Sequence, residues 1–565
     1  MFIPATESEM RALGWDRLDV VLVTGDAYID HPSMGVSIIG HVLMDAGYRV
    51  GVVAQPSLES GDDISRLGEP RLFWGVSAGS IDSLVANYTP SLKRRRSDDY
   101  TPGGLGGRRP DRAVIAYANL IRRFFRNTRP IVLGGIEASL RRVAHYDFWT
   151  DSIRRSVLFD AKADSLVYGM GEKAVLQLAG RLATGRDFRD VPGTCSIAKD
   201  RPEGAVELPS YEEVSRDDEA FARMFGLFCG AGDAALAQRH GDRWLVQNPP
   251  QPCLTTEELD RVHGLDFERG LHPSCGPEGS VRALETIRFS LTTHRGCFGG
   301  CSFCSISVHQ GRAIVSRSKA SVVEEARKLT EHPGFKGIIA DVGGPTANMY
   351  GARCGRRSGA FACRDRRCLW PEVCPSLRAG HRQQTELLTE LRRVPGVKKV
   401  FVASGIRHDL VMADAEAGRE FLAQVVAHHV SGQLKIAPEH SEKGVLDLMG
   451  KPGTECLVAF KDLFYRLNRS CGKSQFLTYY LLAAHPGCTL EDMEKLKRFA
   501  TEELRTNPEQ VQIFTPLPST WSALMYRTGR NPFDGSEIFV QRDASGRGRQ
   551  KDVLTARARI GKRRR

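Results

Sequence analysis

The segment that decides the fold reads Ile287-Arg-Phe-Ser-Leu-Thr-Thr293 and continues as His294-Arg-Gly-Cys297-Phe-Gly-Gly-Cys301-Ser-Phe-Cys304. Its first half is apolar at alternating positions, which predicts a short strand. Its second half places three cysteines in one loop directly after that strand. Glycines at positions 296, 299 and 300 allow tight turns of the backbone beside the sulfurs. We therefore expect a strand that delivers a group of thiols to the edge of a sheet.

Five more segments after this one have strand character: residues 337–341, 397–403, 433–437, 475–483 and 510–514. The intervals between them carry helical spacing of apolar residues, for example in residues 321–330 and 489–498. Strands that alternate with helices favour parallel pairing through right-handed crossovers. Six such units over residues 286–520 predict a partial (β/α)6 TIM-type barrel, in which the loops after the strands carry the chemistry.

A separate α/β pattern fills the N-terminal part of the chain. Short apolar runs alternate with helical patterns such as Met34 to Ala46, which Gly47 closes. The runs are residues 19–24, 48–54, 72–77, 130–135 and 165–169. They predict a Rossmann-like, doubly wound domain over residues 1–200. Residues 91–110 interrupt it as a long polar loop, and residues 201–285, which are mixed and proline-bearing, indicate a connector.

The composition is that of a large globular protein. The chain has 565 residues, 41% of them hydrophobic, enough for two or three domains. Its apolar runs stay well below the roughly 20 residues of a membrane helix. Residues 1–9 lack the basic leader and the apolar stretch of a signal peptide. We therefore expect a cytoplasmic protein without a membrane partner.

The formal net charge of +12 sits mostly in the C-terminal extension, residues 521–565. Residues 542–565 hold ten Lys or Arg against two Asp, a balance of +8 that leaves +4 for the other 541 residues. Such basic tails are usually disordered and solvated, and we expect a disordered tail here. The other interpretation is a tail that binds RNA or another polyanion.

Fourteen cysteines in a cytoplasmic protein indicate metal binding or catalysis rather than disulfides. Cys297, Cys301 and Cys304, the first cysteine set, fit one corner of an iron–sulfur cubane. A [4Fe–4S] cluster normally takes four cysteines, so three leave one iron open for a substrate. Alternatively, His294 or His309 would complete a four-ligand zinc site.

Four more cysteines, the second cysteine set, fall between the second expected barrel strand and the next helix: Cys354, Cys363, Cys368 and Cys374. Their spacing matches no zinc-ribbon signature, and five arginines are interleaved with them. Four thiolates suit a closed zinc site or a second iron–sulfur cluster, whose negative charge the arginines would offset. The second cysteine set is therefore a candidate second metal site, with a reactive or purely structural set of thiols as the alternative.

The CxxxCxxC spacing of the first cysteine set, with an aromatic before its last cysteine, resembles the radical S-adenosylmethionine superfamily. The resemblance implies that a [4Fe–4S] cluster binds S-adenosylmethionine and cleaves it reductively to a 5′-deoxyadenosyl radical. It also implies that Phe303 lines the adenine side of the pocket, and that carbonyls of residues 341–346 take the methionyl ammonium. Pro345 stands where the superfamily has an acidic residue, so a plain Gly-Gly-Pro turn is the alternative.

Polar residues after the third and fourth barrel strands complete the expected cofactor pocket. A hydroxyl and a cation suited to ribose and carboxylate follow the third strand, and Glu439 and His440 follow the fourth. The expected S-adenosylmethionine contacts are Phe303, Gly343, Gly344, Ser404, Arg407 and Glu439. Ordinary polar groups at strand ends are the alternative, and no residue that acts on the substrate is assigned.

Several motifs narrow the resemblance to the YgiQ-type family: residues 21–33, 99–104, 134–142, 168–172, 437–440 and 514–518. The likeness covers nearly the whole chain but gives no substrate, because that family's reaction is not established. The N-terminal domain is also similar to cobalamin-binding modules through residues 133–135 and 168–172. The DxHxxG pattern of such modules is broken, because His31 stands one residue too early, and we do not expect cobalamin as a cofactor.

The sequence thus predicts a radical S-adenosylmethionine enzyme that acts on an unknown substrate, with RNA or protein as candidates. A flavodoxin- or ferredoxin-type protein would supply the electron. The alternative is a metal-stabilised nucleic-acid-binding protein that holds zinc at both cysteine sets and catalyses nothing. The odd number of cysteines in the first set favours the enzyme.

Overall fold

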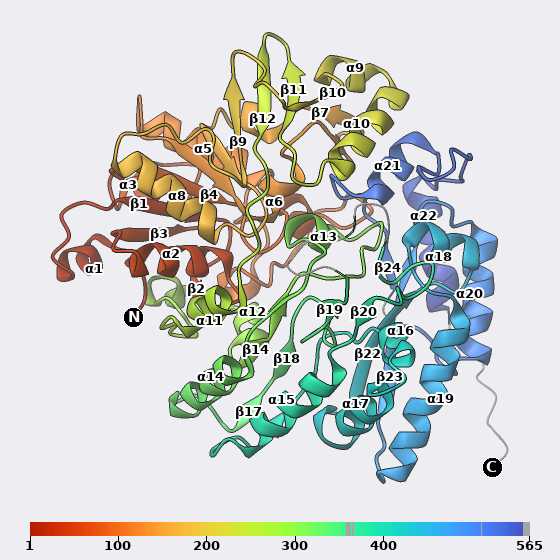
Figure 1. Ribbon diagram of the computed structural model, residues 1–565. Helices are drawn as coiled ribbons and strands as arrows, with labels where there is room; N and C mark the ends of the chain where they lie inside the picture. Colours follow the sequence, from red (N-terminus) through yellow and green to blue (C-terminus); the bar gives the residue numbers. More distant parts are fainter. Residues whose placement is uncertain (357–362, 364–366, 510, 557–565) are drawn as a thin grey trace. The chain divides into compact units, whose positions relative to one another are not determined.

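The computed structural model describes residues 1–356, 363, 367–509 and 511–556 (Figure 1). The chain divides into two compact units. Unit 1 comprises Met1–Cys253 and Arg261–Arg288, and unit 2 comprises Leu254–Asp260 and Phe289–Arg565. Among the described helices, none combines the length and the apolar character needed to cross a membrane.

Unit 1 is built on a nine-stranded sheet in which five consecutive strands, reaching from the middle of the sheet to one edge, run parallel. They pair in the order β3, β1, β4, β5, β8, and all five lie where the apolar runs predicted strands. Their bounds are β1 Val20–Thr24, β3 Val50–Ala54, β4 Phe73–Ser77, β5 Ile131–Gly134 and β8 Ser165–Val167. All residues of β1 are buried, so both faces of the sheet are covered, as in doubly wound folds. The predicted Rossmann-like domain is confirmed.

Helices pack on both faces of this sheet. Phe73 points to one face, where it shares a hydrophobic cluster with side chains of α2 (Gly35–Asp45). Its neighbour Trp74 points to the opposite face, because successive side chains of a strand alternate. The Trp74 ring lies 5.1 Å from that of Phe125, which directly follows α5 (Ala113–Phe124). The core of unit 1 therefore has a layer on each side of the sheet.

Most of residues 201–285, expected as a connector, belong to unit 1 and widen its sheet. Three strands from this region follow β9 (Thr194–Ala198) at the edge: β12 (Arg243–Gln247), β11 (Leu236–His240) and β10 (Val206–Leu208). Two residues, Gly241 and Asp242, join the antiparallel strands β11 and β12, and Gly241 has a φ of +63°. A Gly-Asp pair between apolar runs is a sequence signal for a tight hairpin, and the connector interpretation overlooked it.

Unit 2 contains the six expected β/α units. Its strands are β14 (Ser290–Thr292), β17 (Ile338–Ile339), β18 (Asp341–Gly343), β21 (Lys399–Val400), β22 (Gln433–Glu439), β23 (Phe476–Ala483) and β24 (Val511–Ile513). Parallel pairing joins β14 to β18, β17 to β21, β22 to β23, and β23 to β24. A bridge between Ile406 and Ile436 continues the order from β21 to β22. Helices run along the outside of these strands (Figure 1): α14 (Lys319–Glu331), α15 (His381–Arg393), α19 (Thr454–Ser470) and α20 (Leu490–Glu502).

The structure differs from the expected disordered tail. Residues 544–555 form helix α22 (Ala544–Thr555), which packs against α20 and β24. The Gln550 side chain accepts a hydrogen bond from the Ala484 amide at 2.8 Å and donates one to the Cys488 carbonyl at 2.9 Å. Leu554 is fully buried. The prediction of disorder rested on the positive charge of the tail, whereas a few buried contacts fix residues 544–555. Residues 557–565 lie outside the described residues.

Candidate functional site

The first cysteine set lies on the loop after β14, between the short strand β15 (His294–Arg295) and helix α13 (Ser305–His309). β15 pairs with β16 (Val315–Ser316), which follows that helix, so the loop is closed at its base. Gly296 has a φ of +82°, and a Cβ there would lie 1.8 Å from the Ala313 carbonyl oxygen. Only glycine fits this position, which fixes where the cysteine loop leaves the strand.

The thiols of the first cysteine set lie close together. A Cβ on Gly299 would be 3.2 Å from the Cys297 Sγ and 3.6 Å from the Cys301 Sγ, so both sulfurs flank the same glycine. Burial, together with the two neighbouring thiols, raises the pKa of Cys304 to about 12. Burial also raises the pKa of Cys297. Thiolates in this loop therefore need a positive partner, which bound iron would supply.

This donor set fits a [4Fe–4S] cluster. Across the described residues, no group of three or more His, Cys, Asp or Glu surrounds a position for a single metal ion. A cubane has a different requirement, because each of its cysteines binds a different iron. Three sulfurs on one glycine-rich loop meet that requirement and would leave the fourth iron open.

Arg407 lies against the first cysteine set, where the sequence predicted a contact to S-adenosylmethionine. Its Nη1 donates to the Cys301 Sγ at 3.5 Å, and its Nε donates to Asp409 at 2.8 Å. Burial alone would raise the pKa of Asp409, but the opposing effect of the Arg407 guanidinium is larger, so the pKa is lowered and the carboxyl stays ionised. The sequence interpretation missed Asp409, which holds the guanidinium in place beside the sulfur.

The Gly-Gly segment and Ser404 lie together at the ends of β18 and β21. The Gly343 carbonyl accepts a hydrogen bond from the Thr293 amide at 2.7 Å. A Cβ on Gly344 would lie 2.7 Å from the His294 ring, so this backbone passes close to the cysteine loop. The Ser404 hydroxyl donates to Asp341, which also accepts from the Ala403 amide at 2.8 Å. Asp341 was not among the expected site residues, although it fixes Ser404.

Phe303 belongs to the loop of the first cysteine set, and Glu439 is the last residue of β22. The Phe303 ring meets the His485 ring edge-on at 6.2 Å. Glu439 ends β22 with a φ of +70°, a strained conformation for this residue type that is common at functional sites. Its carboxylate lies 3.4 Å from the Lys451 Nζ. His440 is buried and faces Cys488 at 3.4 Å, so it packs inside the barrel wall.

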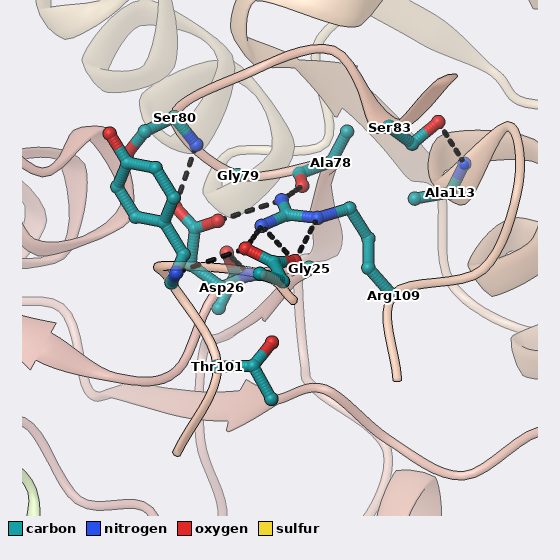
Figure 2. Close-up of polar contacts among 12 residues, drawn as sticks. Gly25, Asp26, Ala78, Gly79, Ser80, Ser83, Thr101, Arg109 and Ala113 are labelled. Atoms are coloured by element: carbon teal, nitrogen blue, oxygen red, sulfur yellow. Dashed lines mark hydrogen bonds and ion pairs between the residues drawn. The ribbon is translucent and has the colours of Figure 1, made fainter. Parts of the chain in front are cut away.

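The carboxyl edge of the unit 1 sheet carries a buried network of charges (Figure 2). The strand order reverses between β1 and β4, and doubly wound sheets bind ligands at such a switch point. Here the Arg109 guanidinium lies 2.7 Å from Asp26 and 3.0 Å from Asp98, and its side chain is fully buried. The Ser80 amide donates to Asp26 at 2.6 Å. The switch point is therefore filled by ion pairs of the protein itself.

His31, the histidine of the broken DxHxxG pattern, is buried in unit 1. Its Nδ1 accepts from the Ser33 amide at 3.0 Å, and its Nε2 lies 3.0 Å from the Arg269 Nη1. Burial and the Arg269 charge hold the pKa of His31 well below its usual range. Because the Ser33 amide uses the lone pair of Nδ1, the proton of the neutral ring sits on Nε2, and His31 presents no free lone pair to a metal.

Two solved structures share this fold. The radical S-adenosylmethionine methyltransferase TsrM of Kitasatospora setae, solved with cobalamin and a [4Fe–4S] cluster, matches with a TM-score of 0.51 and 16% identity over 90% of this chain and 74% of that chain. OxsB, a cobalamin-dependent S-adenosylmethionine radical enzyme solved with aqua-cobalamin, matches with a TM-score of 0.50 and 12% identity over 90% and 55%. The expectation that excluded cobalamin is therefore wrong, because this fold holds cobalamin in both structures. A broken DxHxxG pattern was not a sufficient reason to exclude it.

Sequence comparison covers the whole chain. Residues 2–290 match the family model described as radical SAM N-terminal. The chain is 50% identical to a UPF0313 protein of Fusobacterium nucleatum, over 98% of each. It is 49% identical to a UPF0313 protein of Thermotoga maritima, again over 98% of each. The chain is a radical S-adenosylmethionine enzyme and belongs to the UPF0313, or YgiQ-type, family.

Proposed function

We propose that the first cysteine set holds a [4Fe–4S] cluster whose open iron binds S-adenosylmethionine. Reduced by one electron, the cluster supplies the chemistry that splits S-adenosylmethionine into methionine and a 5′-deoxyadenosyl radical. The gathering of three thiols on one glycine-rich loop is the observation that carries this proposal. A flavodoxin- or ferredoxin-type protein is the partner that would deliver the electron. RNA and protein are the candidate substrate classes for the radical.

The loops around the first cysteine set suit the two ends of S-adenosylmethionine. Thr293 bonds the Gly343 carbonyl, and the next residue, Gly344, runs beside the cysteine loop without a side chain, so its carbonyl oxygen can approach a methionyl ammonium. Ser404 is fixed by Asp341 and keeps its lone pairs for a ribose hydroxyl. Phe303 offers an aromatic surface to adenine.

Glu439 completes the proposed contacts as an acceptor for ribose hydroxyls. The cation of Lys451 at 3.4 Å offsets the charge of its partly buried carboxylate. Arg407 has a separate role in this proposal. Because its guanidinium is occupied by Asp409 and Cys301, it acts on the cluster sulfur and not on the S-adenosylmethionine carboxylate.

The test is an anaerobic reconstitution with iron and sulfide, followed by dithionite and S-adenosylmethionine. We expect 5′-deoxyadenosine from the wild type and none from a variant with Cys297→Ala, Cys301→Ala and Cys304→Ala. Cys229→Ala, which removes an exposed cysteine of unit 1, is the matched control and should keep full activity. Equal product from the triple variant would refute the proposal.

The same preparation also tests the alternative, a nucleic-acid-binding protein without catalysis. That alternative requires zinc in place of iron and RNA binding that weakens steeply with salt. A colourless zinc protein without 5′-deoxyadenosine formation would replace the enzyme proposal with the binding protein.

Cobalamin enters the reconstitution as a second cofactor, since solved structures of this fold hold it. The Ser33 amide uses the lone pair of the His31 Nδ1, which leaves the ring proton on Nε2. We therefore expect the absorbance spectrum of cobalamin taken up by the protein to be the same in His31→Ala as in the wild type. A spectral change on this substitution would show that His31 turns toward the cobalt.

A further inference from the structure

The backbone of unit 2 brings the second cysteine set together. Cys354 lies in β19 (Arg353–Cys354), which pairs antiparallel with β20 (Leu377–Arg378) and places Cys354 opposite Leu377. The Leu377 amide in turn donates to the Cys374 carbonyl at 2.8 Å. The Cys374 amide donates to the Cys368 carbonyl at 2.8 Å, which closes the chain between these two cysteines into a loop. Three cysteines that span twenty-one residues are thereby held at one place.

The side chains of the second cysteine set also interact. The thiols of Cys354, Cys363 and Cys374 lie close enough to the Cys368 thiol to interact with it electrostatically. All four thiols are half-buried, and the structure joins none of them in a disulfide. Four thiols that repel one another as thiolates are stable together when a metal centre binds them.

Arginines link this group to the first cysteine set. Arg312 donates to the Cys363 carbonyl, and its side chain also lies beside the thiol of Cys368 and beside Gly300. Arg367 donates to the Ser302 hydroxyl at 3.1 Å. These cations stand where a centre bound by four thiolates would carry net negative charge.

A shared hydrophobic cluster places the two sets side by side within unit 2. Phe298 of the first loop and Leu369 of the second are buried in this cluster, and Cys297 and Cys368 pack against it. Apolar surroundings of this kind exclude water from a cluster and stabilise it.

We propose that Cys354, Cys363, Cys368 and Cys374 hold a second iron–sulfur cluster, separate from the one on the first cysteine set. Four thiolates close all four irons of a cubane, so this second cluster has no open iron for S-adenosylmethionine. The proposal concerns its own ligands and stands whether or not the first set binds a cluster.

The test measures iron, acid-labile sulfide and zinc in full-length protein reconstituted anaerobically. The triple variant Cys297→Ala, Cys301→Ala, Cys304→Ala leaves the second cysteine set intact, and we expect it to retain about four iron and four sulfide per chain. Cys368→Ser with Cys374→Ser should lose that amount and keep the iron of the first set. The wild type should hold the sum, about eight iron.

Each outcome bears on the second set separately from the first. Retention of about four iron in the triple variant, with loss in the double variant, supports the second cluster. Zinc in the triple variant, or an absence of metal, overturns it. Failure of the first set would instead appear as about four iron in the wild type and none in the double variant. Because the deciding measurement uses the triple variant, poor folding of the double variant does not affect it.

Discussion

At the scale of single residues, Arg407 is the feature of the site with the clearest electrostatic role. Its guanidinium donates to the Cys301 Sγ, a ligand of the proposed cluster, while Asp409 neutralises its other side. A positive charge beside a cluster sulfur favours the reduced, more negative cluster and raises its reduction potential.

Replacing Arg407 should therefore lower the reduction potential of the first cluster. Arg407→Gln alone would leave Asp409 as a buried charge without its partner, at a cost of about 3–5 kcal/mol. The paired variant Arg407→Gln with Asp409→Asn avoids that cost. We expect its potential, measured by redox titration with electron paramagnetic resonance, to fall by tens of millivolts, because one hydrogen bond is worth about 1 kcal/mol and about 59 mV corresponds to 1.4 kcal/mol for one electron. The exposed Arg419→Gln is the control, and an equal shift there would contradict the local origin of the effect.

Gly79 is required by the buried charges of unit 1. It has a φ of +103°, and a Cβ there would lie 2.1 Å from the Asp26 carboxylate (Figure 2). Gly14 has a similar positive φ, +70°, with open space around its Cβ position. Gly14→Ala should therefore cost only the backbone strain, about 1–2 kcal/mol, whereas Gly79→Ala should cost about 1–3 kcal/mol more. Chemical denaturation measures both, and equal losses would show that the crowding at Gly79 relaxes freely.

At the scale of elements, β11 carries a histidine, His240, whose protonation destabilises the folded state. His240 stacks on Phe159 at 4.6 Å and on Tyr211 at 5.5 Å. Burial and the charge of Arg155 lower its pKa to about 3. The unfolded chain takes up this proton near its ordinary pKa of about 6.5, and the folded chain resists it.

The stability of unit 1 should therefore fall as the pH drops from about 6.5 toward 3, by at most about 1.4 kcal/mol per pH unit from this residue. His240→Phe keeps the stacked ring and removes the proton site, so its denaturation midpoint should fall less steeply over this range. If the denaturation midpoints of the variant and the wild type fell equally with pH, the acid sensitivity would come from residues other than His240.

The elements also show what the sequence can predict. Every long apolar run became a strand, because a run such as 20–24 has no other way to bury both faces. The Gly241-Asp242 turn also predicts a hairpin, but its two strands are only half apolar, which favoured a connector over a pair of strands. The network of Asp26, Asp98 and Arg109 could not be predicted from the sequence, because Asp26 lies more than seventy residues before its partner Arg109 and the two meet only in the folded chain.

In the candidate site, too, some features could be predicted from the sequence and others could not. Spacing alone placed the three cysteines on one loop, since local backbone geometry decides their grouping. The direction in which Arg407 points depends on Asp409 and on a sulfur 106 positions away, so its role could not be read from its place after a strand.

At the scale of the whole molecule, α22 ties the C-terminal extension to the barrel. A chain ended after Arg542 loses the buried bonds of Gln550 to residues 484 and 488, each worth about 1–3 kcal/mol when one partner is left unsatisfied. We expect its unfolding temperature to fall by several degrees in calorimetry. A chain ended after Ala556 keeps these bonds and should unfold at the wild-type temperature; equal loss in both would assign the stabilisation to residues beyond 556.

The filled switch point of unit 1 has a consequence for how the protein responds to ionic strength. Asp26, Asp98 and Arg109 are each 5% exposed or less, so dissolved counter-ions do not reach them. Screening acts on exposed pairs such as Arg11 with Glu7 and weakens them within a Debye length of about 10 Å at 0.1 M salt. We therefore expect the edge of the sheet to keep its arrangement from low to high salt concentration, so that desalting or high-salt chromatography leaves the interior of this domain unchanged.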